Sequence, residues 1–275
     1  MSSKYQLLAL DLDGTTLSPD GSISPRVQLA VKRVLESGCH VSLCTGRSTA
    51  TTLPIESQLG LSRPLPLVTF NGAVGVAADR VELFRETLTQ NQVDAALSVA
   101  ASLDLAVNYY DANRIKCITS NEAQAALAER YRKLTNCDYD FSITSFEGLP
   151  LPPKLILLTL DPASLMAVLK EKVPGVGLVQ DSYFVECLPA GVTKGFGFEK
   201  LCAALKVPLK NTVAFGDGFN DVEFLQAAGL GVAMKNARDV LKEAADKVTE
   251  FTNAEDGLAI ELEKMLEQGL FGTAQ

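Results

Sequence analysis

Four aspartates stand after short apolar runs of the chain, in positions from which carboxylates could do chemistry. Asp11 and Asp13 follow the run Leu7–Leu10, and Asp217 and Asp221 follow a second run much later in the chain. Two carboxylates held 4 Å apart repel each other by about 4 kcal/mol at an effective dielectric constant of 20. If the fold brings these aspartates together, they must either take up protons or bind a cation.

The available ligands favour Mg²⁺ as that cation. The chain has a single histidine, His40, which begins an apolar run and which we interpret as structural, and it has no CxxC pair. Zinc sites use mainly His and Cys ligands, whereas Mg²⁺ takes hard oxygen ligands such as carboxylates. Lys194 would add a second positive charge. Together with a threonine hydroxyl and backbone N–H groups exposed by glycine, such a site would suit a phosphate group.

The spacing of Asp11 and Asp13 suggests two different roles in the hydrolysis of a phosphate ester. Asp11, at the end of a strand, can attack phosphorus as a nucleophile and form an aspartyl-phosphate. Asp13 lies on the same side if the chain stays extended. It can protonate the leaving oxygen and then activate water, a contribution of typically about 10²–10⁴-fold. Gly14 lets the chain turn sharply after this pair.

A parallel sheet would position these residues. Short apolar runs typical of buried parallel strands occur at Leu7–Leu10, Val41–Cys44, Leu67–Phe70, Thr212–Phe215 and Leu230–Ala233. Ser24 followed by Pro25 predicts that a helix begins between the first two runs. Parallel strands all end at the same edge of a sheet, where such folds bind ligands. We therefore expect the following residues to converge at that edge: Asp11, Asp13, Thr45, Asp217, Asn220 and Asp221.

The middle of the chain has a different pattern. Residues 83–189 combine strand-turn-strand units with two helical stretches, Gln92–Ala101 and Glu122–Lys133, which favours a separate α+β domain. We therefore predict an α/β protein. Its doubly wound, mostly parallel, Rossmann-like core comprises residues 1–82 and 190–275, and an inserted α+β cap comprises residues 83–189. We expect the cap to close over the site, exclude bulk water and select the leaving group.

The motifs resemble those of the haloacid dehalogenase superfamily. Residues 11–16 read DLDGTT, residues 45–47 read TGR, Lys194 precedes a glycine, and residues 216–221 read GDGFND, all in the expected order and spacing. The resemblance covers nearly the whole chain and is greatest to the sugar-phosphatase-like branch with a large inserted cap, type IIB. The dehalogenases of this superfamily lack an aspartate at the position of Asp13.

The resemblance implies a role for each matching residue. It makes Asp11 the nucleophile and Asp13 the general acid and base. It assigns Mg²⁺ to Asp11, Asp217 and the main-chain carbonyl of Asp13, with Asp221 supporting the metal ion and Lys194. We therefore count all four aspartates as metal-site residues. The candidate residues for binding the phosphoryl group and substrate are Thr45, Gly46, Arg47, Asn71, Lys194 and Asn220.

Each motif alone also has an ordinary structural interpretation. DLDG could begin a Ca²⁺ loop, although such a loop would need glycine at Thr16 and a preceding helix. Lys194 could be a solvated lysine at a helix start, and Arg47 could pair with a surface acid. Only the joint order of the motifs at successive strand ends favours catalysis. One departure from the family pattern is Lys235, which stands where a small residue is expected and bears on the conformation of a loop.

We predict a Mg²⁺-dependent phosphatase that acts on a small phosphate monoester such as a sugar phosphate. One alternative is a phosphomutase or phosphotransferase of the same fold. A mutase must hold a second phosphate, and the arginines of the predicted cap are few: Arg85, Arg114, Arg130 and Arg132. The other alternative is a non-catalytic phosphate-binding regulator, which the intact set of acids disfavours.

Composition narrows the range of partners. The 275 residues carry 33 acidic and 25 basic side chains, a formal net charge of −8 that disfavours a nucleic-acid partner. We see no long Lys/Arg run suited to an anionic membrane, and no segment approaches the roughly 20 apolar residues that span a bilayer. Six cysteines without a CxxC pair suggest free thiols in a reducing compartment. We therefore expect a cytoplasmic protein that is a monomer or a weak homodimer.

Overall fold

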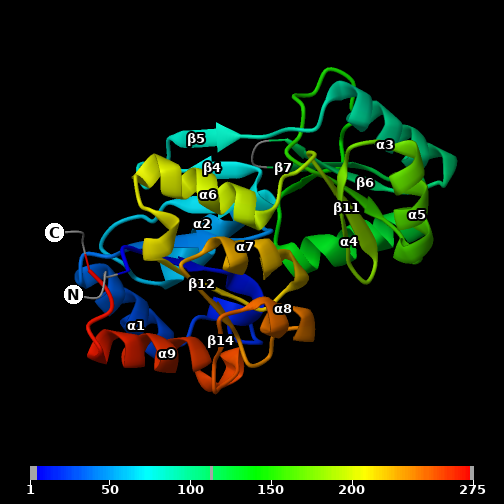
Figure 1. Cartoon of the computed structure of the whole chain (residues 1–275). Coiled ribbons are helices and arrows are strands. Elements are labelled where there is room, and N and C mark those ends of the chain that lie inside the picture. Colours follow the sequence, from blue (N-terminus) through cyan, green and yellow to red (C-terminus); the bar gives the residue numbers. More distant parts are fainter. Residues whose placement is uncertain (1–4, 112–113, 273–275) are drawn as a thin grey trace. The chain divides into compact units, whose positions relative to one another are not determined.

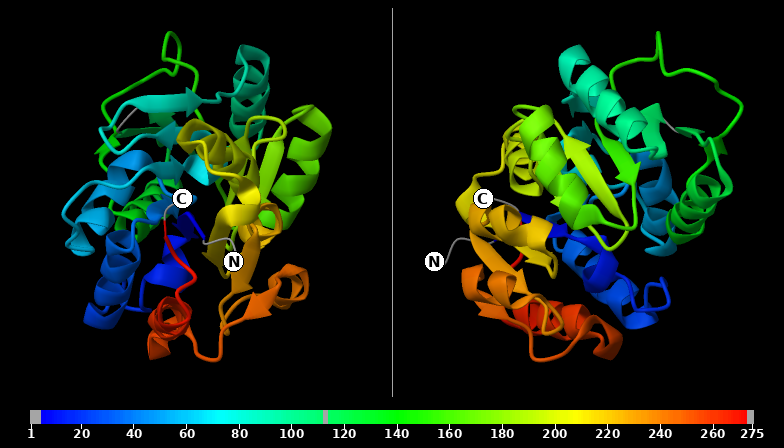
Figure 2. Two further views of the ribbon diagram at one scale, coloured as in Figure 1. Left: turned by 60° about the vertical axis from the view of Figure 1, so that its left-hand side comes forward. Right: turned by 90° about the vertical axis from the view of Figure 1, so that its right-hand side faces the viewer.

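The computed structural model describes residues 5–111 and 114–272 (Figures 1 and 2). The chain divides into two compact units. The first comprises Met1–Gly46, Thr52–Phe84 and Thr193–Gln275, and the second comprises Arg47–Thr51 and Arg85–Val192. Catalysis by residues 1–82 with 190–275, and substrate selection by residues 83–189, stay predictions.

The first unit is built on a mostly parallel sheet. Its described strands are β1 (Leu7–Leu10), β2 (His40–Cys44), β3 (Leu67–Thr69), β4 (Val74–Val76), β5 (Glu82–Arg85), β12 (Thr212–Gly216), β13 (Leu230–Ala233) and β14 (Lys247–Val248). They lie in the order β14-β13-β12-β1-β2-β3-β4-β5. Neighbours from β14 to β3 are parallel, and β4 runs antiparallel to β3. The central strands β1 and β12 are completely buried, as continuous apolar runs covered on both faces should be.

Helices cover both faces of this sheet. The described α-helices are α1 (Pro25–Glu36), α2 (Thr49–Gln58), α6 (Lys194–Leu205), α7 (Val222–Ala227), α8 (Asp239–Ala244) and α9 (Gly257–Glu267). Figure 1 shows α1 and α9 side by side on one face and α6 and α7 on the other. Helix α1 begins as predicted: Ser24 accepts a hydrogen bond from the N–H of Val27 (3.2 Å), and Pro25 takes the first helical position.

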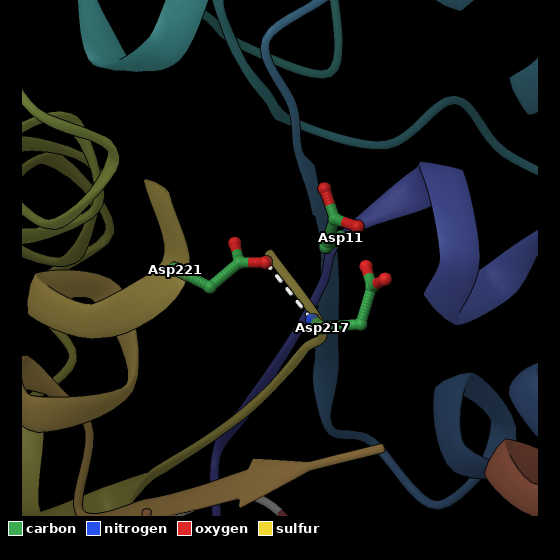
Figure 3. A group of neighbouring side chains, drawn as sticks. All are labelled: Asp11, Asp217 and Asp221. Atoms are coloured by element: carbon green, nitrogen blue, oxygen red, sulfur yellow. Dashed lines mark hydrogen bonds between the residues drawn. The ribbon is translucent and has the colours of Figure 1, made fainter. Parts of the chain in front are cut away.

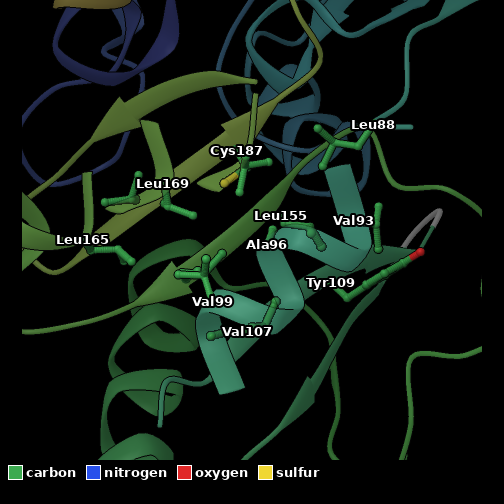
Figure 4. Close-up of a cluster of buried hydrophobic side chains, with 14 residues drawn as sticks. Leu88, Val93, Ala96, Val99, Val107, Tyr109, Leu155, Leu165, Leu169 and Cys187 are labelled. Atoms are coloured by element: carbon green, nitrogen blue, oxygen red, sulfur yellow. The ribbon is translucent and has the colours of Figure 1, made fainter. Parts of the chain in front are cut away.

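The second unit is an antiparallel sheet with helices. Its described elements are α3 (Gln90–Ser102), β6 (Val107–Asp111), β7 (Arg114–Ile118), α4 (Glu122–Thr135), β8 (Tyr139–Asp140), β9 (Leu155–Leu158), α5 (Pro162–Lys172), β10 (Gly177–Gln180) and β11 (Phe184–Leu188). The strand order is β10-β11-β9-β6-β7-β8, with only the β7–β8 pair parallel. Side chains from α3 and α5 pack on one face of the sheet in an apolar core that includes Val93, Val99, Leu155, Leu165 and Leu169 (Figure 4).

Helix α5 is a third helix in this part of the chain, where only two are predicted from the sequence, so that prediction was wrong. The start signal is present: Asp161 accepts a hydrogen bond from the N–H of Ser164 (3.1 Å), and Pro162 follows at the first helical position. The helix buries only Leu165 and Leu169 among its own residues. Met166 and Val168 pack partly buried beside these two residues, so the apolar side chains form a nearly continuous run in the sequence and the helical periodicity is weak.

Short turns complete the described structure. They are η1 (Leu12–Thr16), η2 (Phe70–Gly72), η3 (Leu209–Asn211), η4 (Phe219–Asp221) and η5 (Asn253–Glu255). Among residues 5–111 and 114–272, none of the helices is both long enough and apolar enough to cross a membrane.

Candidate active site

Asp11 lies where strand β1 ends and a sharp turn begins. Its backbone N–H continues the pairing with β12 by donating to the carbonyl of Phe215 (3.0 Å). The turn η1 closes with a hydrogen bond from the N–H of Leu17 to the carbonyl of Leu12 (2.8 Å), and Gly14 takes a positive φ of 78° within it. The side chain of Asp11 is buried, whereas Asp13 on the same turn is exposed. The turn therefore gives two nearby carboxylates different environments.

Asp217 and Asp221 come from the loop that follows β12. One oxygen of Asp221, Oδ2, accepts the backbone N–H groups of Asp217 (3.0 Å) and Gly218 (2.8 Å), so this carboxylate holds the loop in shape (Figure 3). Gly216 permits the arrangement, because a Cβ atom there would lie 2.5 Å from Cγ of Asp221. A glycine at the end of the strand is thus required by the close approach of a side chain.

Lys194 joins these two loops. It is the first residue of α6, which Thr193 caps by accepting the N–H of Phe196 (3.2 Å). The fully buried ammonium donates to Oδ1 of Asp11 (2.7 Å) and to Oδ1 of Asp221. Burial disfavours the charged lysine, but the two carboxylates outweigh burial and hold the pKa of Lys194 above its ordinary value. The lysine therefore remains a fixed positive charge.

One lysine is not enough to balance the acids around it. One carboxylate oxygen from each of Asp11, Asp217 and Asp221 can be chosen so that all three lie within 4.8 Å of one another (Figure 3). Burial raises the pKa of Asp11 well above its usual value, against the opposing effect of Lys194. Burial, reinforced by Asp221, raises the pKa of Asp217 to about 6. In the folded protein, the ionised forms of Asp11 and Asp217 are therefore energetically unfavourable.

The donor set fits a magnesium ion. All the candidate ligands are oxygen atoms, and carboxylates are the ligands that Mg²⁺ prefers in proteins. The three acids are not equivalent, however. Both oxygens of Asp221 already hold Lys194 and the backbone of the loop. By contrast, the side chain of Asp217 accepts one longer hydrogen bond from the described residues, donated by the hydroxyl of Thr15 (3.3 Å). Asp11 and Asp217 are therefore better placed to coordinate an ion than Asp221.

A second group of site residues surrounds Asn71. Its backbone N–H donates to the carbonyl of Thr45 (3.1 Å), and its side-chain oxygen accepts the amide of Asn220 (2.8 Å). Asn71 adopts a left-handed conformation with φ 53°, which asparagine tolerates better than most residues. A Cβ atom at Gly46 would lie 2.8 Å from Oδ1 of Asn71, so glycine is needed there for the close approach. The loops that follow β2, β3 and β12 thus meet at Asn71.

The first unit therefore brings together nearly all the residues singled out in the sequence. The hydrogen-bonded and neighbouring members are Asp11, Asp13, Thr45, Gly46, Asn71, Lys194, Asp217, Asn220 and Asp221. Arg47 differs, since it falls in the segment Arg47–Thr51 of the second unit. Its contact with substrate stays a prediction, as do the individual roles of the other residues.

Three supporting residues of the site are not among those predicted from the sequence. Thr16 donates from Oγ1 to the carbonyl of Asp11 (2.5 Å), and Thr15 donates to Asp217. Asn236 donates to the carbonyl of Gly14 (2.8 Å). The two threonines belong to the DLDGTT motif, so the sequence contained a signal for them. Asn236 stands beside Lys235, whose side chain is exposed, so the loop accommodates this lysine.

The comparisons with known proteins agree with this geometry. A profile of the haloacid dehalogenase-like hydrolases matches residues 8–262. A Haemophilus influenzae protein, named provisionally as a phosphatase, is 31% identical over 271 residues, which cover 94% of this chain and 98% of that protein. The 5-amino-6-(5-phospho-D-ribitylamino)uracil phosphatase YitU of Bacillus subtilis is 28% identical over 272 residues, 94% of this chain and 97% of its own.

A solved structure shows the same fold. The haloacid dehalogenase-like hydrolase from Bacteroides thetaiotaomicron superimposes with a TM-score of 0.83 at 26% identity, covering 95% of this chain and 100% of its own. The chain belongs to the haloacid dehalogenase-like hydrolase family. The predicted family and α/β fold class are thereby confirmed, and so is the prediction of an enzyme that hydrolyses phosphoric monoesters.

Proposed function

We propose that the protein is a Mg²⁺-dependent phosphatase that hydrolyses a small metabolite phosphate, such as a sugar phosphate, through an aspartyl-phosphate on Asp11. One observation carries this proposal: a buried lysine holds Asp11 and Asp221 beside Asp217, in a cluster with an excess of negative charge. A phosphoryl group with a divalent ion would complete the charge balance. The Bacillus subtilis relative is named as the phosphatase of a small phosphate ester, which supports a small metabolite phosphate as the substrate of this protein.

Asp11 is placed for attack on phosphorus. Lys194 holds Oδ1, so we assign the attack to Oδ2. The bond between phosphorus and the leaving oxygen breaks as the new bond from Asp11 forms. Asp13, exposed on the same turn, donates a proton to the leaving oxygen, so that the leaving group departs as an alcohol while the phosphoryl group stays on Asp11.

The second half of the reaction uses the same aspartates. Asp13, now deprotonated, takes a proton from a water molecule, whose oxygen attacks phosphorus and displaces the carboxylate of Asp11. Phosphate leaves and Asp11 is regenerated. Bound Mg²⁺, held by Asp11, Asp217 and the main-chain carbonyl of Asp13, would supply positive charge beside the phosphoryl oxygens. Asp221 serves as a positioning residue that fixes Lys194 and the Asp217 loop.

The test measures phosphate released from a panel of metabolite phosphates with and without Mg²⁺. Asp11→Asn should abolish turnover, because the nucleophile is lost, and rapid quenching should trap a phosphoenzyme in the wild type but not in this variant. Asp20→Asn, at an exposed acid outside the site, is the matched control. Undiminished Mg²⁺-dependent hydrolysis by Asp11→Asn would contradict the nucleophile assignment.

The role of Asp13 has a separate test. Asp13→Asn should lower turnover by about 10²–10⁴-fold while Mg²⁺ binding, measured by calorimetry, changes little. The reason is that the ion is assigned the carbonyl of Asp13 and not its carboxylate. Equal loss of binding and turnover would count against this division of roles.

Product analysis with a hexose 1-phosphate distinguishes the phosphatase from the mutase alternative. A mutase would yield the 6-phosphate, whereas a phosphatase releases free phosphate.

A further inference from the structure

The second unit contains a pocket of its own. Its volume is about 550 Å³, within the range of small-molecule sites. Asp94 and Leu97 of α3 form part of the lining, Tyr109 and Ile118 of the sheet form another part, and the loop of residues 145–149 forms a third. All of the described lining residues belong to the second unit, and none is among the candidate active-site residues. The pocket is therefore formed by one unit alone.

The loop that lines this pocket is held in place by defined contacts. The hydroxyl of Tyr109 donates to the carbonyl of Pro150 (2.7 Å), directly after the loop. Within the loop, the N–H of Glu147 donates to Oγ of Ser145 (3.0 Å). The rings of Phe146 and Tyr109 are stacked, with centroids 5.3 Å apart and planes inclined by 13°. These contacts fix Phe146 and Glu147 at the pocket.

The pocket offers apolar surface to a ligand. Val93 and Tyr109 are buried in the core of the unit (Figure 4). Leu97, Ile118 and Phe146 also line the pocket but are only partly buried. Partly exposed apolar side chains gathered in a hollow are typical of binding sites. Aromatic rings favour stacking with a further ring, and their faces attract cations within about 6 Å.

Two carboxylates add negative charge to this apolar surface. Asp94 and Glu147 are exposed lining residues, and none of the described lining residues is basic. Neither carboxylate forms an ion pair within the described part of the chain, although Asp94 accepts a hydrogen bond from the amide of Gln90 (2.7 Å). Burial, with the charges of Asp111 and Asp94, raises the pKa of the Tyr109 hydroxyl, so the negative charge reaches the interior of the pocket. An anion would be repelled here, and a neutral ligand would leave both charges unbalanced.

We propose that this pocket binds a small organic cation with a flat apolar body, such as an aromatic amine. The ammonium group pairs with Asp94 and Glu147, and the ring packs against Phe146 and Leu97. An exposed ion pair alone contributes little, but the hollow combines two of them with aromatic contact. The net charge of −8 also favours the approach of a cation. Binding at this pocket does not depend on the proposed phosphatase function.

Three probes of one shape and different charge provide the first test: naphthylmethylammonium, the neutral naphthylmethanol and the anionic naphthoate. Binding to the full-length protein is measured by calorimetry at low ionic strength, without Mg²⁺ or a phosphate ester. The ammonium should bind at least about fivefold more tightly than the alcohol, because it gains two charge contacts and a cation–π contact, and the carboxylate should bind most weakly. No saturable binding of the ammonium, or equal affinities for the ammonium and the alcohol, would overturn the proposal.

The second test removes the two charges at the pocket. Asp94→Asn with Glu147→Gln should abolish the preference for the ammonium and leave the affinity for the alcohol unchanged, and both side chains are exposed, so the variant should fold. The control, Asp138→Asn with Glu171→Gln, removes two exposed acids of the same unit outside the pocket and should keep the preference. A preference that survives in the first variant, or that disappears in the control, would reveal a general effect of net charge and contradict the site.

The aromatic part of the pocket has its own test. Phe146→Leu keeps an apolar side chain in the loop but removes the ring, so the affinities for the ammonium and the alcohol should both fall by at least about threefold. Unchanged affinities for both probes would show that they bind elsewhere, against the proposal.

Discussion

At the scale of single residues, charge balance is the main feature of the site. When Asp11, Asp217 and Asp221 are ionised, they face the single ammonium of Lys194, and burial raises the pKa values of both Asp11 and Asp217. The folded protein thus holds acids where their charges are unfavourable. Such an arrangement is typical of functional sites, where local stability is given up for binding or catalysis.

Asp217→Asn should therefore stabilise the metal-free protein while abolishing its response to magnesium. Burial raises the pKa of Asp217 to about 6, so above that pH its ionised form lowers the free energy of unfolding. Removing the charge should raise this free energy by about 1–3 kcal/mol at neutral pH. The gain should shrink as the pH falls from about 6 toward the ordinary value of 3.8, because the wild-type group then protonates. Denaturant titration at several pH values measures it.

The same variant should show no rise in melting temperature on addition of Mg²⁺, whereas the wild type should be stabilised by the ligand. Asp239→Asn is the matched control, since its side chain is 94% exposed on α8 and should behave as the wild type. A metal-free Asp217→Asn protein that is less stable than the wild type would show that the carboxylate is stabilising, against the charge argument.

At the scale of elements, the site depends on how closely the turn η2 approaches the start of α6. Gly72 has a φ of 98°, and a Cβ atom there would lie 1.9 Å from the carbonyl oxygen of Thr193. Gly197, one turn into the helix, also lies close to this turn, since its own Cβ would lie 2.5 Å from Cα of Gly72. These two glycines allow the helix that carries Lys194 to lie against the turn that carries Asn71.

Gly72→Ala should consequently lower both stability and turnover. The backbone strain of an alanine at positive φ and the clash with a backbone oxygen should together cost about 2–5 kcal/mol. The helix start must shift to relieve the clash, which displaces Lys194. Gly21→Ala isolates the strain, because Gly21 also has a positive φ (81°) but no neighbour within 4 Å of the added Cβ. Similar losses of stability and unchanged turnover in both variants would contradict the close-packing argument.

At the scale of the whole molecule, every cysteine is a buried free thiol. The six residues lie in both units and form no disulfide. Burial raises the pKa of Cys39, Cys117, Cys187 and Cys202 to about 12. Because the thiolate is the reactive form, these side chains act as small apolar residues of the interior.

Thiol labelling should therefore report on global unfolding. At neutral pH the native protein should react with an aromatic disulfide reagent only slowly, and all six thiols should react once the protein is unfolded in guanidinium chloride. The time course is followed by absorbance. Rapid labelling of even one thiol in the native protein would show an accessible thiolate and contradict the burial argument.

Much of the architecture can be predicted from the sequence because its signals are local. The continuous apolar run Leu7–Leu10 indicates a buried strand, and Ser24 with Pro25 fixes where α1 begins. The motifs around Asp11 and Asp217 likewise indicate phosphate chemistry through their residue types and spacing alone. Helix α5 shows the limit of this reasoning, because its apolar residues 165–169 follow one another directly and give no clear helical periodicity in the sequence.

The sequence by itself determined which strands form and which polar residues follow their ends, since both depend on neighbours along the chain. Only the tertiary structure decided the partners: Lys194 with Asp11, Asn220 with Asn71, and Lys154 with Glu186. These pairs are far apart in sequence, and packing and strand register bring them together. A contact of this kind leaves no local pattern, because its geometry is set by the elements on which the two residues lie.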